Sequence, residues 1–251
     1  MVNNVRAVLF DLDDTLLYSD VGSLEKGFLQ HYFRLLTDYA RSLADPQTFM
    51  AALLTATQAM QRDQHPDTTN EQAFAPVFAA HLGRPWPELK PLFARFYEEQ
   101  FPALRGHTRS LPAARRAVET CLDAGYRVAI ATNPLFPARA IEHRLEWAGV
   151  SDMPFDLVTT YENMHACKPS PDYYREIAAM LGVDPGACLM AGNDVQRDIE
   201  PAQAVGMRTF LVDRWLAGDD SQVKPDGRGT LQDFIEWITK SNLLFAIHHL
   251  I

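Results

Sequence analysis

The chain opens with an apolar run over residues 5–10, VRAVLF, which is interrupted only by Arg6. Such a run, rich in β-branched and other apolar residues, is typical of a strand that is buried on both faces of a parallel sheet. Four later runs have the same character and are bounded by polar or glycine-containing segments: 126–133, 156–162, 187–194 and 208–213. The pattern therefore predicts five buried strands.

Helical periodicity separates these strands. Apolar residues at steps of three and four predict helices over 112–124, 137–147, 171–181 and 231–239, with a further helix ending near Gly206. Gly125, Gly149 and Gly182 follow three of these helices, as C-capping glycines do. Alternation of strands and helices at this pitch predicts right-handed βαβ units and a parallel sheet, and so an α/β fold.

Residues 18–105 show helical periodicity alone. One apolar stripe runs from Leu24 to Leu36, a new helix is expected at Asp45–Pro46, and two more stretches end at Gly83 and near Phe101. A loop is expected over 65–70, and a proline-punctuated segment, 84–91, precedes the last stretch. We therefore expect a core of residues 1–17 and 106–251 with an all-helical domain, 18–105, inserted after the first strand.

Composition narrows the class of protein. The chain has 251 residues, of which 47% are hydrophobic and 22% charged, enough for one large domain or two unequal ones. A net charge of −9 disfavours binding to nucleic acid or to an anionic membrane. The apolar segment 243–251 is too short to span a bilayer, and we expect it to pack on the core or on a partner subunit.

Cysteine usage points to the cytoplasm. Cys121, Cys167 and Cys188 are widely spaced, and the chain has no Cys-x-x-Cys pair or Cys/His cluster. This predicts reduced thiols rather than disulfides or a structural zinc site. The N-terminal apolar run is interrupted by Asp11, so no signal peptide is expected.

Polar residues suited to phosphate chemistry follow four of the predicted strands. They are Asp11 and Asp13, Thr132 and Asn133, Lys168, and Asn193, Asp194 and Asp198. Each group has a plainer explanation, as a helix cap, a turn or a solvated lysine. However, the carboxyl ends of parallel strands meet at one edge of a sheet, which is where ligands bind. Clustered carboxylates repel one another unless a cation lies among them, so a divalent metal is the simplest partner.

The ordered set resembles the haloacid dehalogenase-like (HAD) superfamily of hydrolases. The four motifs of that family match DLDDT, the Thr132 of ATNP, the Lys168 of CKPSP, and GNDVQRD. The resemblance covers the core, and the helical insert matches the α-helical cap of one large subgroup in position and character. It implies a Rossmann-like sheet of five strands, numbered along the chain, in the order 5-4-1-2-3.

The resemblance also implies a reaction. Asp11 would be the nucleophile that forms an aspartyl phosphate, and Asp13 the general acid and base. Thr132, Asn133 and Lys168 would bind the phosphate. Carboxylate and amide oxygens suit Mg²⁺, which Asp11, Asp13, Asp194 and Asn193 would hold, with Asp198 behind them. The expected activity is hydrolysis of a small phosphomonoester.

Several alternatives stay open. Dehalogenation would go with loss of the second aspartate and of the metal ligands, and both Asp13 and Asp194 are present. A phosphomutase would use the same residues, and a catalytically silent binding protein belongs to another class. Neither the particular phosphomonoester nor the oligomeric state follows from the sequence.

The fourth motif departs from the family pattern. Many members have Gly-Asp where this chain has Gly192-Asn193, so we expect the charged Asp194 to be the main anionic ligand. We also expect a loop over 193–197 and a helix whose N-cap is Asp198, because Pro201 belongs in a first turn.

Overall fold

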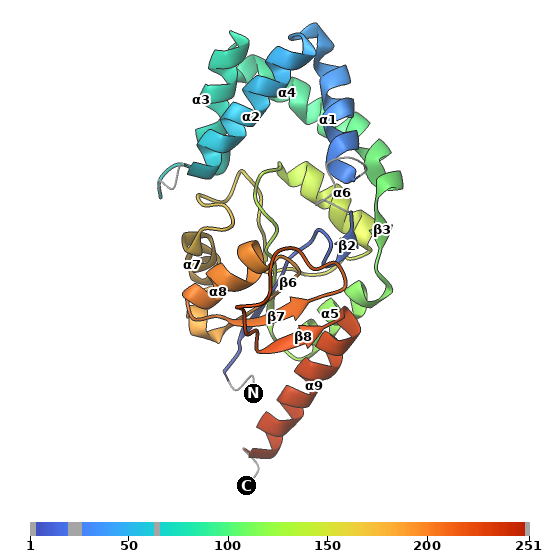
Figure 1. Cartoon of the computed structure of the whole chain (residues 1–251), viewed down its shortest axis with the longest axis vertical. Coiled ribbons are helices and arrows are strands. Elements are labelled where there is room, and N and C mark those ends of the chain that lie inside the picture. The colour runs from blue at the N-terminus through green and yellow to red at the C-terminus, as the bar shows by residue number, and fades with distance from the viewer. Residues whose placement is uncertain (1–3, 20–26, 63–65, 249–251) are drawn as a thin grey trace.

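The structure, a computed structural model, describes residues 4–19, 27–62 and 66–248, with side chains described as far as residue 241. The molecule is elongated (Figure 1). A group of helices lies at one end, a sheet flanked by helices lies in the middle, and the last helix projects from the other end. Among the described residues, no helix has the length and apolar character that crossing a membrane requires. The expectation for the apolar tail 243–251 lies outside the described side chains.

The central sheet is parallel, as predicted, and β1 lies in its middle. The strand order is β5-β4-β1-β6-β7-β8, and every neighbouring pair is parallel. The strands are β1 (Ala7–Phe10), β4 (Arg127–Ile130), β5 (Leu157–Val158), β6 (Cys188–Gly192), β7 (Arg208–Val212) and β8 (Gly227–Gly229). The five expected strands therefore lie in the expected order, but the sheet has a sixth strand at its edge.

The sixth strand was missed because it carries no apolar pattern. A Cβ on Gly227 would lie 2.5 Å from Cδ2 of Phe210 and 2.9 Å from Cε2 of Trp237. The backbone of β8 therefore lies directly against these aromatic rings, which fill the space that side chains of an ordinary strand would occupy. The sequence Gly-Arg-Gly is typical of a loop, because its own side chains supply no apolar packing. Here the neighbouring aromatic rings supply that packing instead.

Both faces of the sheet are covered by helices, which explains the continuous apolar run of β1. All four of its residues are fully buried. Val8 and Phe10 belong to one apolar cluster, and Ala7 and Leu9 to another on the opposite face. The first cluster includes residues of α5 (Pro112–Asp123), α6 (Ala138–Ala148) and α9 (Leu231–His248), and the second those of α7 (Pro171–Met180) and α8 (Glu200–Ala204).

Strand β5 is shorter than the predicted run, 156–162. Its pairing with β4 ends at Val158, and the amide of Thr160 donates instead to Oδ1 of Asn163. The Thr159 hydroxyl hydrogen-bonds to the carbonyl of Thr132, at 2.7 Å. The chain thus turns away from the sheet early, and these local hydrogen bonds replace the ladder.

The helices expected after the first strand lie together at the upper end of Figure 1. They are α1 (Phe28–Tyr39), α2 (Pro46–Arg62), α3 (Asn70–Leu82) and α4 (Trp86–Arg95). Helix α2 begins at Pro46, and Gly83 ends α3 with a φ of 63°, both as predicted. Helix α4 begins inside the proline-punctuated segment, since a proline in a first turn leaves no hydrogen bond unmade. The predicted start at Leu24 lies outside the described residues.

Two short strands connect this helical group to the sheet. Strand β2 (Leu17–Tyr18) leaves the core, and β3 (Arg109–Ser110) returns to it; the two pair antiparallel, with Leu17 opposite Ser110. The return path runs through Phe96–Gln100, a π-helical turn, and Phe101–His107, a 3₁₀ segment. Both connections therefore lie side by side.

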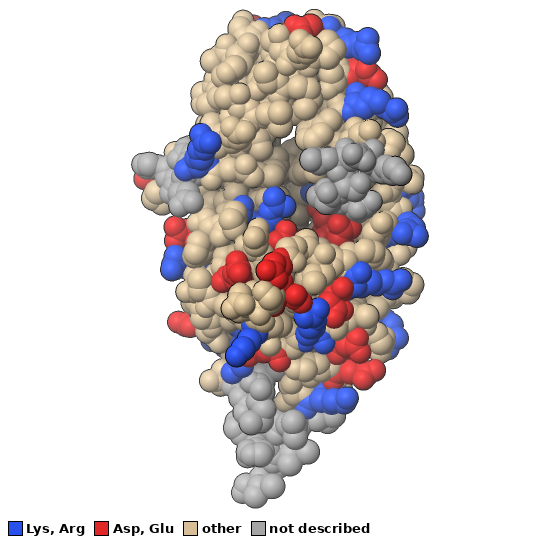
Figure 2. All heavy atoms as spheres, viewed as in Figure 1, with Lys and Arg blue, Asp and Glu red and all other residues tan. Residues whose placement is uncertain are grey.

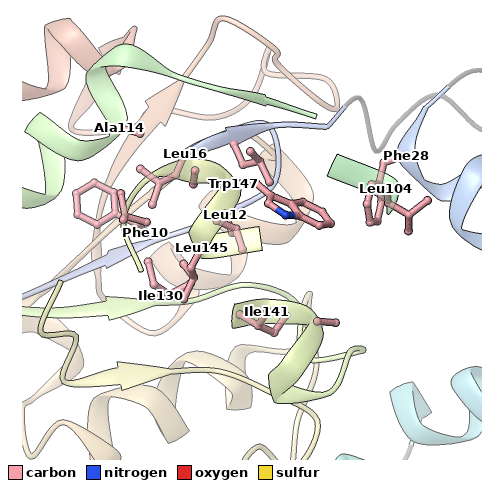
Figure 3. Close-up of a cluster of buried hydrophobic side chains, with 14 of the residues drawn as sticks. Phe10, Leu12, Leu16, Phe28, Leu104, Ala114, Ile130, Ile141, Leu145 and Trp147 are labelled. Atoms are coloured by element: carbon pink, nitrogen blue, oxygen red, sulfur yellow. The ribbon is translucent and has the colours of Figure 1, made fainter. Parts of the chain in front are cut away.

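The helical group also contacts the core away from these strands. The backbone amides of Asn70 and Glu71, at the start of α3, donate to the carbonyls of Met164 and Tyr161, each at 2.8 Å. Helix α6 forms a second contact, where Arg139 binds Glu98 at 2.6 Å. Figure 3 shows a shared apolar cluster in which Trp147 of α6 lies between the core residues and Phe28 and Leu104.

Candidate active site

A tight turn after β1 presents the two carboxylates of the first motif. The Asp11 amide still donates to the carbonyl of Ala191, at 2.9 Å, and is the last of β1's contacts to β6. The Leu12 carbonyl then accepts from the amides of Leu16 and Leu17, both at 2.9 Å. Asp14 completes the turn with a φ of 59°, in the left-handed region that aspartate tolerates better than most residues.

These carboxylates line a cavity of about 340 Å³ at the carboxyl edge of the sheet. Its wall contains every residue that the sequence nominated: Asp11, Asp13, Thr132, Asn133, Lys168, Asn193, Asp194 and Asp198. It also contains Asp14, Leu29, Arg197 and Ala217. Leu29 comes from α1, so the helical group supplies part of the wall. Figure 2 shows a hollow between the helical group and the sheet-containing part, with charged side chains along its lower border.

Lys168 is an internal counter-ion rather than a solvated loop residue. Its side chain is almost fully buried, and Nζ lies 2.8 Å from Oδ1 of Asp11 and 2.6 Å from Oδ1 of Asp198. Burial alone would lower its pKa, but the two carboxylates outweigh burial and hold the pKa well above its usual range. The ammonium group is therefore charged and is shared between two acids.

Asp198 is the other end of this bridge, and its place corrects the prediction that it caps a helix. It is buried, and Oδ2 accepts from the backbone amide of Asp194 at 3.0 Å. Burial raises its pKa to about 7, although Lys168 acts in the opposite direction. Asp198 lies within the site, hydrogen-bonded to Lys168, and contributes to the cavity wall.

Asp194 is the residue that caps the next segment. Its Oδ1 accepts from the amides of Gln196, at 3.0 Å, and Arg197, at 2.9 Å. The expected loop over 193–197 is instead largely a π-helical turn, Val195–Ile199, which leads directly into α8. Pro201 lies in the first turn of α8, as predicted. Asp194 caps this segment in place of Asp198 because the side chain of Asp198 is directed inward, to Lys168.

Thr15 joins the first and fourth motifs. Its hydroxyl lies 3.1 Å from Oδ2 of Asp11 and 3.1 Å from Oδ1 of Asn193. The Asn193 amide nitrogen donates to the carbonyl of Trp215 at 2.7 Å, which fixes the orientation of the amide. The Asn193 oxygen and the Asp11 carboxylate thus contact the same Thr15 hydroxyl.

Thr132 and Asn133 end β4 beside the same cavity. The Thr132 carbonyl accepts from the hydroxyls of Thr159, at 2.7 Å, and Tyr173, at 2.8 Å, which fixes the backbone there. Asn133 Oδ1 accepts from the backbone amide of Lys168 at 3.2 Å. The second motif therefore positions the segment that carries the lysine of the third.

Asp13 is held from two sides. Its Oδ1 accepts from the Ser19 hydroxyl at 3.2 Å, and its Oδ2 lies 2.5 Å from Nη1 of Arg144 on α6. Burial raises the pKa of Asp13; Arg144 lowers it and the charge of Asp11 raises it further, so that the net pKa is above the usual range. A raised pKa is what a carboxyl group needs to donate a proton near neutral pH.

The charges of the site leave room for a cation. Five aspartates line the cavity, Asp11, Asp13, Asp14, Asp194 and Asp198, whereas the cations paired with them are the buried Lys168 and Arg144 and the exposed Arg197. The donors are carboxylate and amide oxygens, which suit a hard cation such as Mg²⁺. Within the described ranges, no three His, Cys, Asp or Glu side chains stand close enough to form a ready-made metal cluster. The donor chemistry fits Mg²⁺ even though the side chains do not already converge on one point.

Besides Asp14, Leu29, Arg197 and Ala217 of the cavity wall, sequence reasoning missed three residues that hold nominated side chains in place. Thr15 was noted only as the end of its motif, and Ser19 and Arg144 were not nominated at all. Arg144 lies in an amphipathic helix with one other arginine and two glutamates, where an ion pair on the surface is the ordinary expectation. Only its burial in the fold, where its side chain is about 2% exposed, distinguishes it.

Comparison with known proteins identifies the family. The family model of haloacid dehalogenase-like hydrolases matches residues 5–206, most of the chain. The chain belongs to this family of hydrolases, and its fold and strand-end residues agree with that membership.

Similar proteins include phosphatases of different names. Phosphoserine phosphatase of Thermus thermophilus is 27% identical over 89% of this chain and 95% of its own length. Hexitol phosphatase B of Escherichia coli is 28% identical over 61% of this chain and 68% of its own length. Phosphatase MT3486 of Mycobacterium tuberculosis is 37% identical, but the match spans only 41% of this chain and 46% of that protein.

Solved structures support the fold. A HAD phosphatase from Thermococcus onnurineus has a TM-score of 0.58 and 21% identity, covering 93% of this chain and 98% of that one. A 2-haloacid dehalogenase from Pseudomonas syringae has a TM-score of 0.63 and 19% identity, covering 94% and 99%. Since phosphatases and dehalogenases share the fold, it does not by itself choose between the two reactions.

Proposed function

We propose that this protein hydrolyses a small phosphomonoester, with Mg²⁺ as cofactor and an aspartyl phosphate as intermediate. The observation that carries the proposal is that Asp11 and Asp13 line one cavity together, with the Lys168 ammonium 2.8 Å from Asp11. The family membership and the phosphatase names of several relatives support it.

Asp11 is the proposed nucleophile. A carboxylate oxygen attacks phosphorus, the bond from phosphorus to the ester oxygen breaks, and Asp13 gives its proton to that oxygen. In the second half, Asp13 takes a proton from water as the water attacks phosphorus, which releases Asp11 and inorganic phosphate. One acid therefore serves first as proton donor and then as proton acceptor.

The remaining residues stabilise the transferring group. Lys168 is charged and lies beside Asp11, so it neutralises the oxygens of the phosphoryl group. Thr132 and Asn133 lie in the same wall and would orient the phosphate. Mg²⁺ would be held by Asp11, Asp13, Asp194 and Asn193, with Asp13 contributing an oxygen other than the one that exchanges the proton. It would supply further neutralisation of charge on the transferring phosphoryl group.

The alternatives use the same nucleophile differently. Haloacid dehalogenation needs no proton donor for its leaving halide, whereas here Asp13 lines the cavity with a raised pKa. A phosphomutase would retain every residue named above. The names of the relatives, which include phosphoserine, hexitol and phosphoglycolate phosphatases, favour hydrolysis of a small phosphate ester.

We also propose that residues 18–105 form a cap domain that selects the substrate. Leu29 of α1 lines the cavity, and the two connecting strands pair side by side as a hinge would require. The leaving group of the ester would then lie against the helical group, while the phosphate binds at the edge of the sheet.

A panel of phosphomonoesters, assayed with Mg²⁺, tests this function. Asp11→Asn keeps the size of the side chain and should reduce turnover to below about 1% of wild type, because loss of a nucleophile removes several powers of ten. Asp152→Asn is the matched control, since Asp152 is an exposed partner of Arg115. Activity of Asp11→Asn near that of the control would contradict the assignment, and halide release from 2-chloropropionate by the wild type would favour the dehalogenase.

A further inference from the structure

We propose that Arg144 is a positioning residue for Asp13, which holds the carboxyl group in place for proton transfer to and from the leaving group. The inference rests on the proposed phosphatase function and adds to it a residue outside the four family motifs. Arg144 lies on the helix α6, whereas the residues of the four motifs follow the ends of strands. It acts through Asp13 and does not line the cavity itself.

The geometry places Arg144 behind the proposed acid. Asp13 lines the cavity, and Nη1 of Arg144 holds its Oδ2 at 2.5 Å. The other carboxylate oxygen, Oδ1, accepts from the Ser19 hydroxyl at the longer distance of 3.2 Å. Arg144 therefore provides the shorter of these two contacts, and it engages only one of the two carboxyl oxygens.

The burial of Arg144 is costly, which argues against a role in packing alone. Its side chain is about 2% exposed, yet Nε and Nη2 are buried with no hydrogen-bond partner in the part of the chain that the structure describes. A side chain without charge would fill this space without leaving donors unpaired. The contact with Asp13 is the polar interaction that distinguishes arginine from such a residue.

Aromatic rings hold the guanidinium group in place. Its central carbon lies 4.7 Å from the centre of the Phe136 ring. The centre of that ring lies 5.2 Å from the centre of the Tyr32 ring of α1. The phenol of Tyr32 hydrogen-bonds to that of Tyr97 at 2.8 Å. Arg144 thus lies between the proposed acid and an aromatic group contributed by the helical insert, and these rings restrict its motion.

Leaving-group dependence separates this role from a structural one. Esters of nitrophenol need little protonation as they depart, whereas alkyl phosphates depend on the acid. We expect Arg144→Met to reduce kcat for an alkyl phosphate at least about tenfold more than for 4-nitrophenyl phosphate. Arg144→Lys should recover most of this difference, because it restores a cation that can bind Oδ2.

The matched control is Arg139→Met, the same substitution on the same helix. Arg139 binds Glu98 and Glu142 and has no contact with Asp13, so the ratio of the two rates should equal that of the wild type. Arg144→Gln provides a second neutral variant if Arg144→Met does not fold, as judged by its thermal unfolding. It should show the same loss on alkyl phosphates.

The outcomes are distinct. Wild-type protein that hydrolyses no phosphomonoester would contradict the proposed function itself. Wild-type turnover, together with equal losses on both kinds of ester in the neutral variants, would show that Arg144 only supports the fold. A selective loss on alkyl phosphates, recovered by lysine and absent from Arg139→Met, would establish the positioning role.

Discussion

Gly192 and Asp198 lie so close together that a Cβ on Gly192 would be 2.3 Å from Oδ2 of Asp198. Because Gly192, at the end of β6, has no side chain, the buried carboxylate of Asp198 can approach the backbone. That carboxylate binds the Lys168 ammonium group, so a side chain at residue 192 would displace a partner of Lys168.

The first prediction is that Gly192→Ala displaces Asp198 and, through it, Lys168. We expect a loss of stability of about 1–3 kcal/mol, the usual cost of overpacking a buried site. We also expect activity to fall, because Lys168 would lose one of its two carboxylates. Gly106→Ala, at a position with nothing within 4 Å of the added Cβ, is the control for urea unfolding and kcat. Equal behaviour of the two variants would contradict the prediction.

Replacement of the proposed acid should depend on the ester. Asp13→Asn keeps the shape of the side chain but removes the proton, so alkyl phosphates should lose more of the first step than 4-nitrophenyl phosphate. General acid–base catalysis contributes about 10²–10⁴-fold, which sets the scale of the loss. Single-turnover bursts measure that step directly. If both kinds of ester lose rate equally, Asp13 is not the acid.

Mg²⁺ should stabilise the protein as well as activate it. Five aspartates line the cavity, and a cation that binds only the folded state stabilises it by mass action. At one hundred times Kd the gain is about 2.7 kcal/mol. In a chain of this size that corresponds to a rise in Tm of roughly 5–10 °C. Melting curves after EDTA treatment, with and without Mg²⁺ at matched ionic strength in NaCl, measure the effect. An unchanged Tm would argue against the metal site.

Among the residues of the fourth motif, we expect Asp194 to matter most for the metal. Asp194→Asn removes a charge but keeps an oxygen that can still cap the following turn, so it tests the charge without unfolding the segment. It should raise the Mg²⁺ concentration needed for half-maximal activity more than Asn193→Ala or Asp198→Asn does. Metal titrations of the three variants decide the order. A larger effect of Asn193→Ala would transfer the main role to the amide that Thr15 holds beside Asp11.

The fold was largely predictable because buried parallel strands and amphipathic helices have distinct periods. The sequence located the five strands, although β5 ends earlier than predicted, and because parallel strands share one edge, it correctly grouped residues as distant as Asp11 and Lys168. It failed where tertiary contacts replace local pattern. Gly227 forms a strand because Phe210 and Trp237 pack on its backbone, and nothing in the sequence Gly-Arg-Gly indicates that.

The details of the site were less predictable for the same reason. Whether Asp194 or Asp198 caps the segment after β6 depends on which one reaches Lys168, a residue some thirty positions earlier in the chain. Arg144 has the helical spacing of a surface residue, and its partner Asp13 is 131 positions away. Such pairs join side chains that are far apart in the sequence. The residues around each partner therefore contain no pattern that predicts the contact.

The start of α3 lies on the segment that leads to Lys168. The amides of Asn70 and Glu71 donate to carbonyls of Met164 and Tyr161, and Ala73 and Cys167 belong to one small apolar cluster with Met60. The helical group is thus fastened to the core on the side opposite its two connecting strands. Rotation about those strands would have to break these contacts, which adjoin the lysine. If the proposed cap opens by such a rotation, its movement would therefore be coupled to the segment that carries Lys168.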